Sequence, residues 1–390
     1  LGSMRPNEGC PLLAAAPLLL LLAGISTTGS SPPARGLLEA ECPLPSASVP
    51  LVRFQTFENG DGPLVIRPEP AKEGLAALQG IQAPLAVVGV AGPGGIGKSA
   101  LLRDLAPHAP GSDPFGGGAG LAEEMGEVRM VVVPPCGSGI EGTSVVFLDS
   151  PGLHDKSMLY DSLVLASLGL ASSVLVYGTP GLEGVERDSS ERLSYAIDQA
   201  LAKTFTYKAL GQLDFNRFDL RPALVWACTG IDTEDAKGGV ERVRGQLQQH
   251  VHNPDASPAA GLGSFVKPLV EVLAVPPAEP LAAAVRSLAT PKGLGSVTVT
   301  GRALAGMLEE WCAAVRKDQR RREDAMASGL GESAYPPELP FSLEELERRI
   351  ANREAAGAAE AFAAYMAGRT RGVMSAEEVE VLREEGEKAA

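Results

Sequence analysis

A glycine-rich stretch at 92–99 contains the residues that point most directly to a chemistry. Its sequence, Gly-Pro-Gly-Gly-Ile-Gly-Lys-Ser, fits the pattern G-x-x-x-x-G-K-S. Glycines let the main chain curl so that successive N–H groups face phosphate oxygens, and a helix that begins there adds the positive end of its dipole. Lys98 would reach the terminal phosphates and Ser99 would ligate Mg²⁺, which gives both residues a catalytic role. The predicted phosphate-binding residues are Gly92, Gly94, Gly95, Ile96, Gly97, Lys98, Ser99 and Ala100.

A second candidate site lies at the end of an apolar run about fifty residues further on. The sequence Asp149-Ser150-Pro151-Gly152 fits D-x-x-G. A carboxylate at a strand end can hold Mg²⁺ through water, and the N–H of Gly152 can sense a γ-phosphate, as in a switch loop. D-x-x-G alone also describes an ordinary strand-to-turn junction. Its distance from the glycine-rich loop favours function, with Asp149 as a metal ligand and Gly152 as a catalytic residue.

A third candidate site concerns the nucleobase. The apolar run 223–228 is followed by Thr229-Gly230-Ile231-Asp232. GTPases commonly place an aspartate after such a strand, often within [N/T]-K-x-D, to accept hydrogen bonds from guanine; here Gly230 takes the place of the lysine. We therefore expect Thr229 and Asp232 to bind guanine, although both would equally well cap the following helix. Asp235 is a lesser candidate for guanine, and His154 is a candidate for orienting water.

These candidates need an α/β sheet to bring them together. Apolar runs predict strands at 64–66, 84–89, 128–133, 145–148, 173–177 and 223–227, and helical spacing predicts helices at 70–79, 99–105, 163–170, 190–203, 301–326, 342–367 and 375–388. The runs 128–133 and 145–148 are expected to pair antiparallel. The pattern predicts a P-loop NTPase fold, in which a mostly parallel central sheet is flanked by helices and followed by a small helical region. We expect a sheet domain at 51–300 and C-terminal helices at 301–390.

The N-terminal residues predict where the chain acts. Leu1-Gly2-Ser3 resemble the remnant of an expression tag, and an apolar run at 11–25 follows Arg5. This pattern is typical of a secretory signal peptide and predicts the secretory pathway or endoplasmic reticulum. An apolar helix packed on the domain, or a transit peptide, also fits and leaves a cytoplasmic or organellar location open. The proline- and serine-rich residues 26–50 predict a linker, so that 1–50 forms a separate terminal segment.

Charge and cysteine content bear on other classes of protein. The formal net charge of −14 argues against a broad nucleic-acid surface, which needs clustered Lys and Arg. The cysteines, Cys10, Cys42, Cys136, Cys228 and Cys312, show no CxxC or Cys/His spacing, so we expect neither zinc nor a disulfide framework. The basic run 316–322 is expected on a solvated helix face, and contact with a membrane of acidic lipids or with a partner is the alternative.

Together these motifs resemble those of the large GTPases of the guanylate-binding protein and atlastin group, in the dynamin superfamily. The chain is most similar to plant-type members with an N-terminal signal-like segment. The resemblance covers about 60–370: the residues 64–69, 171–177 with 192–194, 300–304 and 344–366 are similar to family segments outside the loop. It implies GTP or GDP and Mg²⁺ as ligands, hydrolysis of GTP, and a GTPase domain that dimerises across its nucleotide face.

Departures from the family pattern bear on catalysis. Where relatives carry an arginine finger in the loop this chain has Gly95, and Met125 occupies the place of the switch threonine. An arginine finger contributes about 10³- to 10⁵-fold to turnover. The resemblance therefore implies slow hydrolysis with nucleotide binding retained. Two other classes stay open: a pseudo-GTPase scaffold that contacts partners, and an ATPase or kinase, because the loop recognises phosphates and not the base.

Overall fold

The described part of the chain consists of a sheet and the helices around it. The structure, a computed structural model, describes residues 45–57, 65–106, 126–153, 157–182, 221–231, 236–252, 266–267, 270–275, 278–294 and 297–328, and 348–349, 351–352, 355–356 and 359. The strands of the large sheet are β1 (Val49–Phe57), β2 (Val65–Pro70), β3 (Leu85–Ala91), β4 (Glu127–Val133), β5 (Ser144–Asp149), β6 (Val174–Pro180), β7 (Ala223–Thr229) and β8 (Val270–Val275). The helices are α1 (Lys72–Gln79), α2 (Lys98–Leu105), α4 (Pro135–Ser138), α5 (Met158–Ala171), α9 (Ala236–His252), α11 (Ala278–Leu288) and α12 (Gly301–Ala327).

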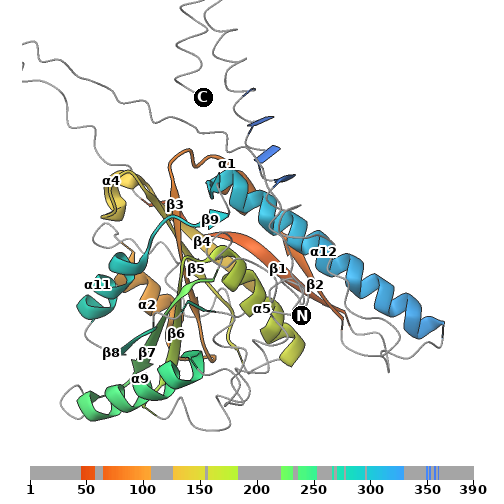
Figure 1. Cartoon of the computed structure of the whole chain (residues 1–390). Helices are drawn as coiled ribbons and strands as arrows, with labels where there is room; N and C mark the ends of the chain where they lie inside the picture. The colour runs from red at the N-terminus through yellow and green to blue at the C-terminus, as the bar shows by residue number, and fades with distance from the viewer. Residues whose placement is uncertain are drawn as a thin grey trace, which may run out of the picture. The chain divides into compact units, whose positions relative to one another are not determined.

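The sheet has the order β2-β1-β4-β5-β3-β6-β7-β8 (Figure 1). The neighbours β5, β3, β6, β7 and β8 run parallel, whereas β2, β1 and β4 join antiparallel at one side. The predicted α/β fold with a mostly parallel sheet is confirmed, and so is the antiparallel pair now seen as β4 and β5. A separate two-stranded antiparallel sheet pairs β9 (Gly293–Leu294) with β10 (Val297–Thr298).

Helices cover both faces of this sheet, and each face has its own apolar core. Alternating residues along each strand separate the two: on β5, Val146 and Leu148 enter one core, and Val145 and Phe147 enter the other. The helices α1, α5, α9 and α12 pack on the first face, and α2 and α11 pack on the second. The central strand β3 is buried along its whole length, as its unbroken apolar sequence predicted.

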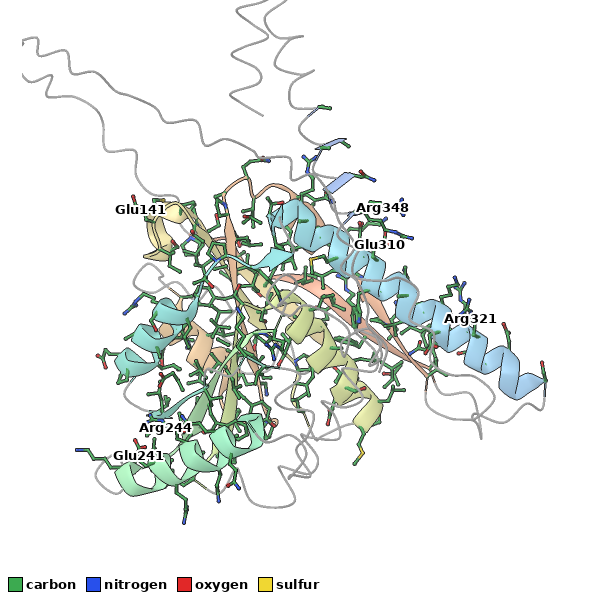
Figure 2. All side chains as sticks on the ribbon, in the orientation of Figure 1. Glu141, Glu241, Arg244, Glu310, Arg321 and Arg348 are labelled. Carbon is green, nitrogen blue, oxygen red and sulfur yellow. The ribbon has the colours of Figure 1, made fainter. Side chains whose placement is uncertain are left out.

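The long helix α12 packs along the edge strand β2 and beside α1 (Figure 1). Its side chains, including Leu304, Leu308 and Trp311, are buried in the same core as the sheet. Gln319 donates a hydrogen bond to the Ile66 carbonyl of β2. Charged side chains lie on the outer surfaces of the helices, for example the pair Arg244 and Glu241 of α9, 2.7 Å apart (Figure 2). Among the described residues no helix is both long enough and apolar enough to span a membrane.

Several elements of the structure were not predicted from the sequence. The strand β1 begins at Val49, and the Ser46 N–H donates a hydrogen bond to the Val132 carbonyl of β4. Val49 and Ser46 both lie within 26–50, which was expected to be a linker. The elements β8, α9 and α11 were not predicted either. Some predictions fall outside the described residues. These are the helices expected at 190–203 and 375–388, most of the helix expected at 342–367, and the signal-like segment.

Candidate nucleotide-binding site

The predicted glycine-rich loop connects the C-terminal end of β3 to the first residue of α2, Lys98. Gly95 and Gly97 adopt the left-handed conformation, with φ of 73° and 83°, which other residues adopt only with strain. Both glycines and Ala100 are exposed, and nothing lies within 4 Å of the position that a Cβ on Gly95 would take. The loop therefore offers open main chain beside the positive end of α2.

Lys98 is held within this loop. Its side chain is buried, and Nζ donates a hydrogen bond to the Pro93 carbonyl oxygen at 2.8 Å. The ammonium group thus lies against main chain that the sequence predicts to surround phosphate. The Lys98 ammonium group can exchange the Pro93 carbonyl oxygen for a phosphate oxygen as its hydrogen-bond acceptor without leaving the loop.

Ser99 and Asp149, which were predicted to share a metal ion, lie together. The Ser99 hydroxyl donates to Asp149 Oδ2 at 2.6 Å, although the two residues are far apart in sequence. The other carboxylate oxygen, Oδ1, is buried without a hydrogen-bond partner. Burial raises the pKa of the Asp149 carboxyl, while the bond from Ser99 and the nearby charge of Lys98 lower it. A hydroxyl and a carboxylate that keeps one unsatisfied buried oxygen are ligands that suit a hard cation such as Mg²⁺.

The segment after Asp149 is fastened to the loop. The Ser150 hydroxyl donates to the Val90 carbonyl at 2.7 Å, and the Leu153 N–H donates to the Gly92 carbonyl at 3.0 Å. Pro93 and Leu153 also form an isolated parallel bridge. Gly152, the predicted γ-phosphate sensor, therefore directly precedes a residue that contacts the loop.

Close packing between Gly92 and β6 was not predicted from the sequence. A Cβ on Gly92 would lie 2.4 Å from the Gly178 carbonyl oxygen, and a Cβ on Gly178 would lie 2.4 Å from Cδ1 of Ile96. The contact at Gly92 is with main chain, so only glycine fits there, whereas the contact at Gly178 is with the tip of the Ile96 side chain, which can move. The available signal was a glycine inside an otherwise apolar strand, which often marks a close approach of main chain.

The predicted guanine site is described only in part. Thr229 is the last residue of β7, and its hydroxyl donates to the Thr179 carbonyl of β6 at 3.1 Å. The Thr229 carbonyl accepts from the Gly181 N–H at 2.8 Å. These bonds fix the ends of β6 and β7 side by side at the same edge of the sheet as the loop. The predicted partner of Thr229, Asp232, lies outside the described residues. The same is true of Asp235, His154 and Met125.

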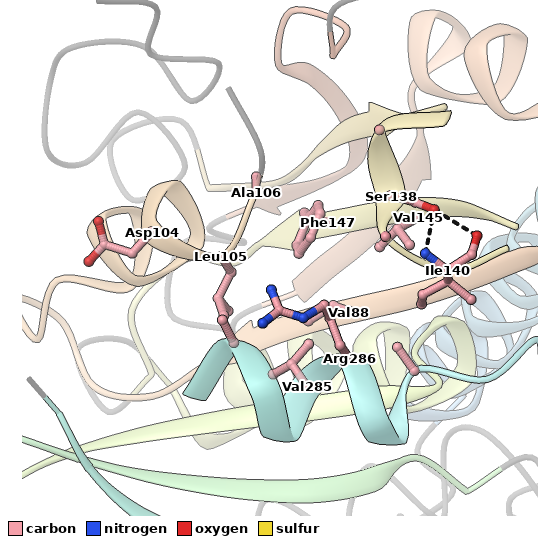
Figure 3. A pocket seen from close by; sticks show the side chains of 14 residues that line it. Val88, Asp104, Leu105, Ala106, Ser138, Ile140, Val145, Phe147, Val285 and Arg286 are labelled. Carbon is pink, nitrogen blue, oxygen red and sulfur yellow. Dashed lines mark hydrogen bonds between the residues drawn. The ribbon is translucent and has the colours of Figure 1, made fainter. Parts of the chain in front are cut away.

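A cavity of about 410 Å³ lies at the opposite end of α2, near Leu105 (Figure 3). Its walls include Val145, Phe147 and Val285, and Figure 3 shows Arg286 reaching between them. None of the predicted site residues lines this cavity. It is therefore separate from the predicted nucleotide site.

Comparison with known families gives one match, at residues 69–227, to the guanylate-binding protein N-terminal domain. The matched residues run from β2 to β7 and include the loop, Ser99, Asp149 and Gly152. They exclude Thr229 and Asp232. No curated protein is significantly similar to the chain in sequence.

Solved structures similar to this one share little sequence with it. Translation elongation factor SelB from Methanococcus maripaludis, in complex with the GTP analogue GppNHp, is 10% identical with a TM-score of 0.29, over 53% of this chain and 34% of its own. A variant of Aquifex aeolicus Era bound to GDP and AlF4⁻ is 16% identical with a TM-score of 0.32, over 58% of this chain and 66% of its own. The G domain of the T. maritima iron transporter FeoB is 15% identical with a TM-score of 0.27, over 53% of this chain and 99% of its own.

Proposed function

We propose that this chain is a guanine-nucleotide-binding domain that hydrolyses GTP with the help of Mg²⁺. One observation carries the proposal: Ser99 and Asp149 meet at 2.6 Å beside the glycine-rich loop, and Asp149 keeps an unpartnered buried oxygen. The sequence separately predicted a P-loop serine and a switch aspartate at these two positions. The match of residues 69–227 to the guanylate-binding protein N-terminal domain supports the same function.

Each residue of the site has a separate part in this proposal. The main chain at Gly94, Gly95 and Gly97 would donate hydrogen bonds to phosphate oxygens, and Lys98 would transfer its hydrogen bond from Pro93 to the β- and γ-phosphates. Ser99 and Asp149 would hold Mg²⁺, which supplies positive charge to the phosphate oxygens. Burial raises the pKa of Asp149, so ionisation of this carboxyl is costly, and a bound cation would offset that cost. The Gly152 N–H would contact the γ-phosphate.

Nucleotide titration tests this assignment. Fluorescently labelled GDP should bind the wild type in the presence of Mg²⁺, and Lys98→Ala should weaken binding at least about tenfold, because one charge-assisted bond is lost. Lys72→Ala is the matched control, since Lys72 is an exposed lysine at the start of α1. Equal binding by Lys98→Ala and wild type would refute the proposed phosphate site. Saturable binding by neither protein would favour a pseudo-GTPase scaffold.

The preference for guanine is a finer part of the proposal. It rests on Thr229 at the end of β7 and on Asp232, which follows it in sequence. Unlabelled GTP should displace labelled GDP far better than ATP does, and Asp232→Ala should reduce this difference. Equal displacement by ATP would instead favour an ATPase or kinase with the same loop.

We further propose that hydrolysis is slow, because Gly95 and Met125 replace the arginine finger and the switch threonine of the family. The open space at Gly95 leaves room for a longer side chain, although its φ of 73° makes any substitution strained. Single-turnover phosphate release should therefore be slow for the wild type and faster for Gly95→Arg, whereas Gly95→Lys serves as a control of equal charge without the planar guanidinium. Rapid release by the wild type would contradict the proposal.

Assembly and location complete the proposal. The domain would form a homodimer across its nucleotide face when GTP is bound, as its resemblance to the large GTPases of the guanylate-binding protein and atlastin group implies. Light scattering of the protein with GDP and with a non-hydrolysable GTP analogue would measure this change in mass. The signal-like segment supports a location in the secretory pathway or endoplasmic reticulum. The exposed basic residues Lys317, Arg320 and Arg321 of α12 are a candidate contact for acidic membranes, to be tested by vesicle sedimentation.

A further inference from the structure

The cavity near Leu105 is separate from the predicted nucleotide site, and no step of the proposed function uses it. Its volume of about 410 Å³ lies within the range of about 300–1,000 Å³ that is common for pockets of small organic ligands. We propose that it binds an unbranched monocarboxylate, whose apolar chain enters the cavity and whose carboxylate pairs with Arg286. This second site does not rest on the nucleotide assignment.

Apolar side chains line most of the cavity. Ala282 and Val285 are three residues apart in α11, so they face the cavity from one side of the helix. The strands β3 and β5 and the end of α2 supply the other apolar walls, with Val88, Val145, Phe147 and Leu105. Burial of an alkyl chain among such side chains removes apolar surface from water. Each added CH2 should therefore tighten binding by up to about fourfold.

The other polar side chains that line the cavity do not neutralise Arg286. The buried Ser138 hydroxyl accepts a hydrogen bond from the Ile140 N–H at 3.1 Å and can donate its proton to the Ile140 carbonyl at 3.0 Å (Figure 3). Asp104 is exposed, and Figure 3 shows its carboxylate pointing away from Arg286. The walls of the cavity therefore leave the positive charge of Arg286 for a ligand.

Arg286 lies at the mouth of the cavity. Its side chain is exposed, and its Cδ would lie 3.6 Å from a Cβ on Gly139, so the side chain extends from α11 toward the turn after α4. Within the described part of the chain, no hydrogen bond or ion pair involves its guanidinium group. A guanidinium group presents a planar set of donors that matches a carboxylate with two parallel hydrogen bonds. A cation of this kind beside an apolar cavity fits a ligand with an apolar chain and one anionic end.

The wall that α4 contributes contains a cross-linked cysteine. Cys136 is disulfide-bonded, and the next residues, Gly137, Ser138 and Gly139, line the cavity. The expectation of no disulfide framework was based on cysteine spacing and needs correction at this one place. Binding to the cavity is therefore measured without a reducing agent, so that the disulfide stays intact.

Calorimetric titration of the full chain with octanoate tests the ligand class. We expect saturable binding at one site, up to about fifteenfold tighter than that of hexanoate, because octanoate buries two more CH2 groups. The uncharged 1-octanol has the same chain length and should bind more weakly, because it lacks the carboxylate. No saturable binding of octanoate, or equal binding of octanoate and 1-octanol, would overturn the inference.

An arginine variant tests the role of the charge. Arg286→Met should weaken binding of octanoate by about fivefold or more and leave binding of 1-octanol unchanged, because a charge-assisted pair is lost while the apolar walls remain. Arg242→Met is the matched control, since Arg242 is an exposed arginine of α9 that does not line the cavity. Wild-type affinity for octanoate in Arg286→Met, or the same loss in both variants, would overturn the inference.

A cavity-filling variant tests the location. Ala282→Phe adds a ring at the cavity wall and should weaken binding of both octanoate and 1-octanol at least about tenfold. Thermal unfolding shows whether the variant is folded, and if it is not, the Arg286→Met comparison still decides. Undiminished binding of octanoate by folded Ala282→Phe would place the ligand elsewhere and overturn the inference. Binding of labelled GDP is measured on the same samples, so a failure of the nucleotide assignment is distinguished from a failure of this one.

Discussion

Replacing either of two loop glycines by alanine should have very different effects on nucleotide binding. Gly92 and Gly95 both have positive φ, 145° and 73°, and both belong to the predicted phosphate loop. A Cβ on Gly92 would lie 2.4 Å from the Gly178 carbonyl oxygen and 2.6 Å from Cδ1 of Ile96. A Cβ on Gly95 would meet nothing within 4 Å. The same chemical change therefore causes a steric clash at one position only.

The size of the difference follows from these contacts. A Cβ on Gly92 approaches main chain about 1 Å closer than ordinary C···O contacts of about 3.3–3.6 Å allow. The disfavoured φ costs about 1–3 kcal/mol and the overpacking about 1–3 kcal/mol, which gives about 2–6 kcal/mol for Gly92→Ala. Gly95→Ala carries the left-handed cost alone, about 1–2 kcal/mol. The free loop can relieve this strain by moving away from the conformation that binds nucleotide. Nucleotide binding must then restore the strained conformation, so the cost of the strain weakens binding.

Titration with labelled GDP in Mg²⁺ measures both variants. At about 1.4 kcal/mol per tenfold change in Kd, Gly92→Ala should weaken binding by about 30-fold or more, and Gly95→Ala by about 5- to 30-fold. Thermal unfolding of each variant controls for loss of the fold. Equal Kd values for the two variants, or wild-type affinity in Gly92→Ala, would refute the account of how β6 and the loop pack together.

Three further changes probe Asp149, the buried Lys292 and the core beneath α12. Because burial raises the pKa of Asp149, ionisation destabilises the fold as pH rises from about 4 through the folded-state pKa, and the penalty remains above it. Asp149→Asn should therefore raise the melting temperature at pH 8 but not at pH 4, and should abolish Mg²⁺-dependent nucleotide binding; an unchanged melting temperature at pH 8 would contradict this. Lys292→Met should lower the unfolding free energy by about 2–4 kcal/mol in urea titrations, because the buried Nζ donates to carbonyls of Gly169, Leu170 and Ser172 at 2.6–3.1 Å. Leu304→Ala in α12 should cost about 2–5 kcal/mol and keep a single unfolding transition, whereas early melting of α12 alone would show that it is not part of the sheet's core.

Local sequence determined the phosphate loop and the strand that carries it. The pattern of Gly92, Gly97, Lys98 and Ser99 follows from what main chain and side chains need to surround phosphate, and the apolar run before it has the composition of a strand buried on both faces. Both were predicted because every requirement lies within about fifteen neighbouring residues. The antiparallel pair β4 and β5 was predicted for the same reason, since the two runs are close in sequence.

Only the tertiary structure decided how distant residues meet. The 2.6 Å bond between Ser99 and Asp149, the contact of Gly92 with Gly178, and the packing of α12 on β2 depend on strand order, which no local pattern contains. Strand β1 was not predicted because its sequence mixes polar and apolar residues without a regular alternation. This mixture fits its position in the sheet, where burial changes from one end of the strand to the other. A sequence specifies groups that can do chemistry, whereas their geometry depends on which faces of the sheet and helices are buried together.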